Sequence, residues 1–136
     1  MTPSEDPDPP SEATADQDRL PDDAVVVRFG LSAPDVLHKT ALAHHDKRGD
    51  FAISVASLPD RSADELARLG ALRHPRIRET TVGRIREVGY DVVPDEPPEG
   101  HALIMLARHP ADDDYETISN AFDDPRPNPV IEEEVR

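Results

Sequence analysis

The sequence predicts a small two-layer domain of the α/β or α+β class, carried between acidic tails. Short runs of β-branched residues alternate with segments whose apolar residues recur at helical spacing, a pattern typical of strands interleaved with helices. A length of 136 residues suits one domain. The acids gather at the two ends of the chain: the net charge is −14, whereas residues 24–111 hold as many acids as bases.

The two ends, residues 1–23 and 124–136, are predicted to be disordered tails. Both are rich in proline and acid and poor in apolar residues, so they cannot bury enough surface to offset the entropy lost on ordering. The core domain is therefore expected over residues 24–123. Acidic tails keep a protein soluble, and they can also engage a basic partner.

The first part of the core is predicted to be strand, helix, strand. Residues 24–30 are a β-branched run that ends at glycine, which indicates a buried strand. Ser32 is expected to cap a helix that has Pro34 in its first turn and ends at Gly49. Residues 51–57 alternate larger with smaller side chains, so they predict a strand whose small-residue face suits the close approach of a helix.

The middle of the chain is predicted to hold two helices. The first begins with a capping-box pattern, S-x-x-E, at Ser62. Pro75 suits the first residue of a second helix over about 75–88. Its apolar stripe recurs at steps of four, four and three, at Ile77, Thr81, Ile85 and Val88. An alternative makes residues 76–79 extended and begins the helix at Thr80.

The last part of the core is predicted to hold two strands, residues 90–93 and 101–107, joined by an acidic loop. The second is nearly all apolar, which is typical of a strand inside a sheet. Three acids at 112–114 favour the start of a final helix that runs to about 122. The expected order is β-α-β-α-α-β-β-α, with Ile85 and Ile104 buried.

The order of elements between residues 32 and 107 resembles that of a winged helix-turn-helix domain. Glu65-Leu66-Ala67, followed by Gly70, resembles the second helix of such domains, and the segment with Arg84-Ile85 that ends at Gly89 resembles the third. The resemblance implies DNA binding through the helix at about 75–88. The side chains that would face phosphates and guanine edges are Arg73, Arg76, Arg78, Arg84 and Arg86.

Three classes of function follow. The favoured hypothesis is a small non-enzymatic interaction or regulatory protein, resembling an antitoxin, an immunity protein or an accessory subunit, which docks on a protein partner through the five arginines. The second is a winged-helix DNA-binding regulator. The third is a small enzyme or toxin-like domain with a cleft for a nucleotide-type anion, lined by Arg76, Arg78, Thr80, Thr81 and His101.

No catalytic residue, metal ligand or cofactor is assigned from the sequence. The chain has no cysteine, which excludes disulfide and thiol chemistry. It has no glycine-rich phosphate loop, and its six histidines include no pair at i and i+4. No apolar run reaches the roughly 18 residues that cross a bilayer, so a cytoplasmic protein is expected, with its oligomeric state open.

Overall fold

The computed structural model describes residues 19–69, 74–96 and 98–131. The expected tail over residues 1–18 lies outside the described residues. The elements, in chain order, are β1 (Val25–Phe29), α2 (Pro34–Arg48), β2 (Ala52–Leu58), α3 (Ala63–Leu69), β3 (Arg76–Thr81), α4 (Val82–Glu87), β4 (Asp91–Pro94), β5 (His101–Met105), α5 (Asp112–Asn120) and β6 (Arg126–Pro127).

The strands form one six-stranded sheet in the order β4-β5-β2-β1-β3-β6, and every pair of neighbours is antiparallel. The domain is therefore of the α+β class rather than the α/β class, because α/β folds are built on parallel strands. The apolar strand β5 lies between β4 and β2, as its composition predicts. Ile104, at its centre, is fully buried, as is Ile85 of α4, so both expectations are confirmed.

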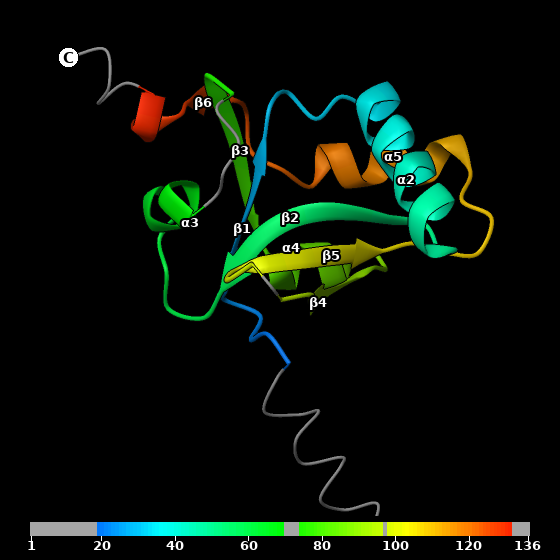
Figure 1. Ribbon diagram of the computed structural model, residues 1–136, viewed down its shortest axis with the longest axis horizontal. Helices are drawn as coiled ribbons and strands as arrows, with labels where there is room; N and C mark the ends of the chain where they lie inside the picture. The colour runs from blue at the N-terminus through cyan, green and yellow to red at the C-terminus, as the bar shows by residue number, and fades with distance from the viewer. Residues whose placement is uncertain (1–18, 70–73, 97, 132–136) are drawn as a thin grey trace, which may run out of the picture.

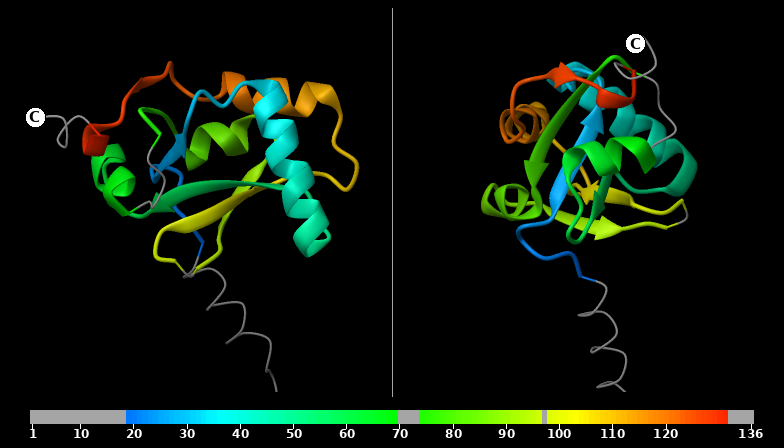
Figure 2. Two further views of the ribbon diagram at one scale, coloured as in Figure 1. Left: turned by 45° about the horizontal axis from the view of Figure 1, so that its top comes forward. Right: turned by 90° about the vertical axis from the view of Figure 1, so that its left-hand side faces the viewer.

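Helices cover both faces of the sheet (Figures 1 and 2). The larger core cluster lies on one face, where Val26 and Ile53 pack with residues of α2, α4 and α5. The smaller cluster lies on the other face, where Val27 and Ile77 pack with residues of α3. The small-residue face of β2 does take a helix, since Ala56 packs into the cluster formed with α3.

Local signals place several helix ends as the sequence predicts. Helix α2 begins at Pro34 and ends at Gly49, whose φ of 87° is the left-handed conformation that glycine adopts readily. Helix α3 has its capping box: the Ser62 hydroxyl accepts from the amide of Glu65, while the Glu65 carboxylate accepts from that of Ser62. The expected cap of α2 was wrong by one residue, because Ala33 occupies the cap position and the buried Ser32 hydroxyl has no partner.

The predicted helix over 75–88 is wrong. Residues 76–81 form β3, which pairs along the whole length of β1, and helix α4 begins only at Val82. The hydroxyl of Thr81 accepts from the amide of Arg84 and so caps this short helix. The alternative with an extended 76–79 is closer to the structure. The element order is thus β-α-β-α-β-α-β-β-α-β, which is not the order of a winged helix-turn-helix.

The core is also longer than expected at its carboxyl end. The prediction that the tail begins at residue 124 was wrong, because Arg126 and Pro127 pair with β3 as strand β6. Asn128 is 1% exposed and donates to the carbonyl of His74. Arg126 forms ion pairs with Asp64 and Glu79, which tie the segment to α3 and β3. Residues 132–136 lie outside the described part of the chain.

At the amino end, residues 19–23 belong to the core rather than to a tail. Leu20 is 3% exposed and packs in the larger cluster, and the carbonyl of Asp22 accepts from the amide of Gly83. Among the helices that the structure describes, none is long and apolar enough to span a membrane.

Candidate functional site

Strands β1 and β2 part after a short stretch of pairing, and the gap between them holds an arginine. The register pairs Val25–Val27 with residues 56–58 and goes no further, so the two strands diverge toward α2 (Figure 1). Arg28 fills the gap: its Nη1 donates to the carbonyl of Ser54 at 2.7 Å, and its Nη2 donates to the hydroxyl of Thr40 at 2.9 Å. The side chain thus replaces β1 as the partner of the Ser54 carbonyl.

A half-open pocket of about 200 Å³ adjoins this gap. Strand β1 contributes Arg28 and Phe29 to it, β2 contributes residues 54–56, the end of α3 contributes Leu69, and the chain before and into β5 contributes residues 98–101. Most of the lining is apolar. The polar side chains on this face of the sheet are those of Ser54, Glu99 and His101, and the Glu99 carboxylate lies 3.9 Å from Arg61 at the exposed rim. Arg28 borders the pocket, but its side chain belongs to the α2 face, where it bonds Thr40.

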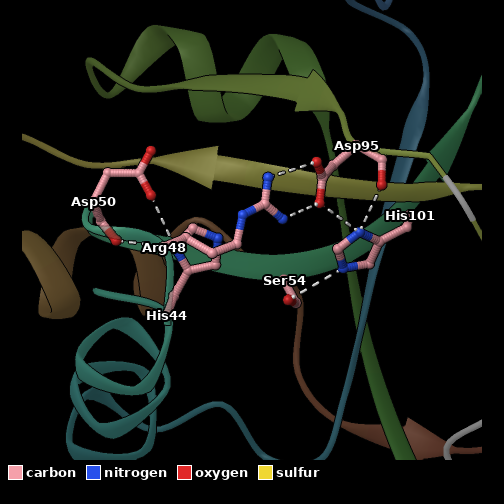
Figure 3. Close-up of polar contacts among 6 residues, drawn as sticks. All are labelled: His44, Arg48, Asp50, Ser54, Asp95 and His101. Atoms are coloured by element: carbon pink, nitrogen blue, oxygen red, sulfur yellow. Dashed lines mark hydrogen bonds and ion pairs between the residues drawn. The ribbon is translucent and has the colours of Figure 1, made fainter. Parts of the chain in front are cut away.

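A chain of polar contacts leads from Arg48 through Asp95 to two residues that line the pocket, His101 and Ser54 (Figure 3). Arg48, at the end of α2, donates both of its terminal nitrogens to the carboxylate of Asp95. His101 Nδ1 lies 3.1 Å from Asp95 Oδ2 and 3.0 Å from the Asp95 carbonyl oxygen. His101 Nε2 lies 3.2 Å from Ser54 Oγ. Three neighbouring strands therefore position these groups, since Asp95 directly follows β4.

The pKa values of Asp95 and Arg28 are both lowered, but for different reasons. Hydrogen bonds from Arg48, with further attraction from His101, hold the pKa of Asp95 below its usual value. Burial lowers the pKa of Arg28, because the charged guanidinium has lost much of its water. No carboxylate among the described residues forms an ion pair with Arg28, and its Nε is buried with no hydrogen-bond partner. Arg28 is thus a cation that lacks a counter-ion.

Ser54, His101 and Asp95 stand in the order of nucleophile, base and orienting acid. Acyl transfer by such a set also requires donors for the oxyanion, commonly a pair of backbone amides. The amides around the loop before β5 are already engaged: Gly100 donates to the Glu96 carboxylate and His101 donates to the carbonyl of Pro98. The arrangement is therefore better suited to holding a polar group of a ligand than to stabilising a tetrahedral intermediate.

The predicted site residue Arg78 is a structural residue. It is 9% exposed and lies beside Arg28 in the register of β1 and β3. All three of its nitrogens donate to oxygens of α5 and of the flanking loops, namely those of Leu31, Ser32, Ser119, Phe122 and Asp123. Burial lowers its pKa. A ligand has no access to a guanidinium whose donors are used in this way.

The other predicted arginines that the structure describes, Arg76, Arg84 and Arg86, do not form one surface. Arg76 begins β3 and Arg84 follows its end, so a strand of roughly 17 Å separates the two. Arg84 forms an ion pair with Asp123, and Arg86 pairs with both Asp22 and Asp91. Arg73 lies outside the described residues.

The expected cleft of Arg76, Arg78, Thr80, Thr81 and His101 is not formed. Thr80 is buried and donates to the carbonyl of Ala121, and Thr81 caps α4. His101 is three strands away from β3 and lies on the opposite face of the sheet from Thr80. Among the described residues, no three His, Asp or Glu side chains converge as a metal site would require.

The sequence contains one signal for the gap between β1 and β2. Arg28 interrupts an otherwise apolar strand, and arginine is almost never buried unless it is paired. No local signal joined Ser54, Asp95 and His101, because they meet only through the pairing of β2, β4 and β5. Comparisons of the chain with protein-family models, with curated proteins and with solved structures gave no match.

Proposed function

We propose that this is a small non-enzymatic interaction or regulatory protein whose state is set by a small ligand in the pocket between β1, β2, β5 and α3. The observation that supports the proposal is the pocket itself: an apolar lining with a few convergent polar groups is the usual form of a ligand site. Ser54 and His101 supply those polar groups. The volume is small, so the ligand is small too.

The experiment is a titration of ¹⁵N-labelled full-length protein with 1-hexanol, a neutral probe. We expect the amide signals of Ser54, Ala56 and His101 to shift together and to saturate. Ala56→Leu should abolish the shifts by filling the pocket. Ala43→Leu, which adds the same atoms to the exposed side of α2, is the matched control and should leave them unchanged. Shifts that are equal in all three proteins would contradict a pocket site.

The enzyme alternative has its own test, because Ser54 and His101 are within hydrogen-bond distance. We expect no release of p-nitrophenol from p-nitrophenyl hexanoate above the rate in buffer. Release that disappears in both Ser54→Ala and His101→Ala would replace the proposed binding function with a hydrolytic one.

Docking on a partner through the predicted arginines stays a prediction, and so does DNA binding. Among the four of these arginines that the structure describes, Arg76 and Arg84 are exposed, and they lie at opposite ends of β3. Fluorescence anisotropy with labelled duplex DNA at about 50 and 200 mM salt tests the DNA hypothesis, since phosphate contacts weaken steeply with salt. Binding that is lost in Arg76→Ala with Arg84→Ala would support it.

A further inference from the structure

The ring of His101, which lines the pocket, has a defined tautomer. Its Nδ1 lies 3.0 Å from the Asp95 carbonyl oxygen and 3.1 Å from a carboxylate oxygen of the same residue. The hydrogen bond from Arg48 holds the pKa of Asp95 below its usual value, so this carboxylate is ionised at neutral pH and only accepts hydrogen bonds. Nδ1 must therefore carry a proton, and Nε2 of the neutral ring is left as an acceptor.

This tautomer sets the direction of the hydrogen bond between His101 and Ser54. Ser54 Oγ lies 3.2 Å from His101 Nε2, so the hydroxyl donates its one proton to the ring. The lone pairs of Oγ remain, and no residue that the structure describes donates to them. These two side chains therefore offer a ligand an acceptor and no free proton.

The rest of the pocket favours an apolar body of limited size. Phe29, Ala56 and Leu69 line it, and its volume of about 200 Å³ exceeds the ~150 Å³ of a cavity that takes benzene. A chain of about six carbons therefore fits. The rim disfavours a negative charge, because Glu99 stands there with its side chain 63% exposed.

We propose that the pocket binds a small neutral alcohol, whose hydroxyl donates to Ser54 Oγ and whose apolar body lies between Phe29 and Leu69. This inference rests on the proposed function, and it names the ligand class of the same site. An ether of the same size has no proton to donate to Ser54. A carboxylate has none either, and it would bring a second negative charge toward Glu99. The binding step involves no covalent chemistry.

The test is a titration of the ¹⁵N-labelled full chain at about pH 8, where imidazole is ordinarily neutral. The three probes are 1-hexanol, 1-methoxypentane, which is an isomer of 1-hexanol that accepts but does not donate, and hexanoate. We expect 1-hexanol to bind at least about threefold more tightly than the ether, because it alone gains a hydrogen bond to Ser54. Hexanoate should bind most weakly, since its charge would leave water without a partner in the pocket.

The variant His101→Phe tests the direction of the hydrogen bond rather than the mere presence of a ring. Phenylalanine has no nitrogen, so the Ser54 hydroxyl loses its acceptor and becomes free to donate to a ligand. We expect the ether to bind this variant about as tightly as 1-hexanol does. His109→Phe makes the same change at an exposed position outside the pocket lining, and it should keep the preference of the wild type for 1-hexanol.

The outcomes separate this inference from the proposed function. If the wild-type protein binds 1-hexanol and the ether equally, and Ala56→Leu blocks both, the pocket is a ligand site but the alcohol class is wrong. A preference for 1-hexanol that persists in His101→Phe would show that the Ser54 hydroxyl is not its source. If no probe binds, the proposed function itself fails. Should His101→Phe not fold, the comparison of probes on the wild-type protein still decides the ligand class.

Discussion

Two neighbouring arginines, Arg78 and Arg28, lie opposite each other in the register of β3 and β1, yet their surroundings differ completely. Around Arg78 the protein is closed, and the guanidinium donates through every nitrogen to oxygens at the end of α5 and before α2. Around Arg28 the strands part, and its Nε has no partner. Arg78 joins β3 to α5 and its flanking loops through every nitrogen, whereas Arg28 joins β1 to β2 and α2 through two of its nitrogens.

The difference shows that neighbouring arginines in one sheet can be held by very different numbers of hydrogen bonds. Burial and a lowered pKa are common to both side chains, so neither property distinguishes them. What distinguishes them is the number of acceptors among the described residues: Arg78 donates to five residues and Arg28 to two. Four predictions test this comparison, beginning with the largest expected effect.

The first prediction concerns the hydrophobic core, on which the surroundings of both arginines depend. Ile104→Asp and Ile85→Asp should each unfold the protein, because each places an unpaired charge at a fully buried position. Circular dichroism with heating should show no cooperative transition for either variant. A normal transition in both would contradict the assignment of the larger core cluster.

The second prediction concerns the closed region. Arg78→Met should cost at least about 3 kcal/mol of unfolding free energy, since several buried carbonyls lose their donor and each orphan costs about 1–3 kcal/mol. Urea unfolding measures the loss. A cost below about 1 kcal/mol would mean that the closed region is not held by this side chain.

The third prediction concerns the parted region. Arg28→Met should cost less unfolding free energy than Arg78→Met, because it removes the donor from two acceptors, whereas Arg78→Met removes it from oxygens of five residues. The same urea experiment gives the matched comparison. If Arg28→Met proved more damaging than Arg78→Met, the distinction between the two arginines would be reversed, and Arg28 would be structural.

The fourth and smallest effect is the pH dependence of the wall beside the pocket. The pKa of Asp95 is depressed in the folded protein, so its stabilising contribution is fully present above the unfolded value of about 3.9 and is lost as the pH falls through the folded value. Asp95→Asn should therefore be less stable than wild type at pH 7 and pH 5, with the difference shrinking below about pH 4.

The control for this prediction is Asp46→Asn, which removes an exposed acid from α2 without touching the pocket. Unfolding of the two variants and of the wild type is followed by urea titration at each pH. A difference between wild type and Asp95→Asn that stays constant from pH 7 to pH 3 would show that the carboxylate charge is not the source.

Sequence reasoning predicted most elements of this fold and missed the site. The strand at Val25–Phe29, the helix from Pro34 to Arg48 and the helix that Ser62 caps all depend on local signals, and all are present. The segment at 75–88 failed because its apolar spacing fits a helix, while the residues that decide its state lie elsewhere. Pairing with β1 overrides the local pattern, as tertiary context commonly does.

The sequence by itself determined the local parts: where helices begin and end, which strands are buried, and how the acids are distributed between the core and the ends. Those properties depend on near neighbours in the chain. Only the tertiary structure decided how many acceptors each arginine reaches, because the acceptors of Arg78 lie about 40 residues away along the chain. The pocket likewise exists only because β1 and β2 part, a property of two strands that neither strand encodes alone.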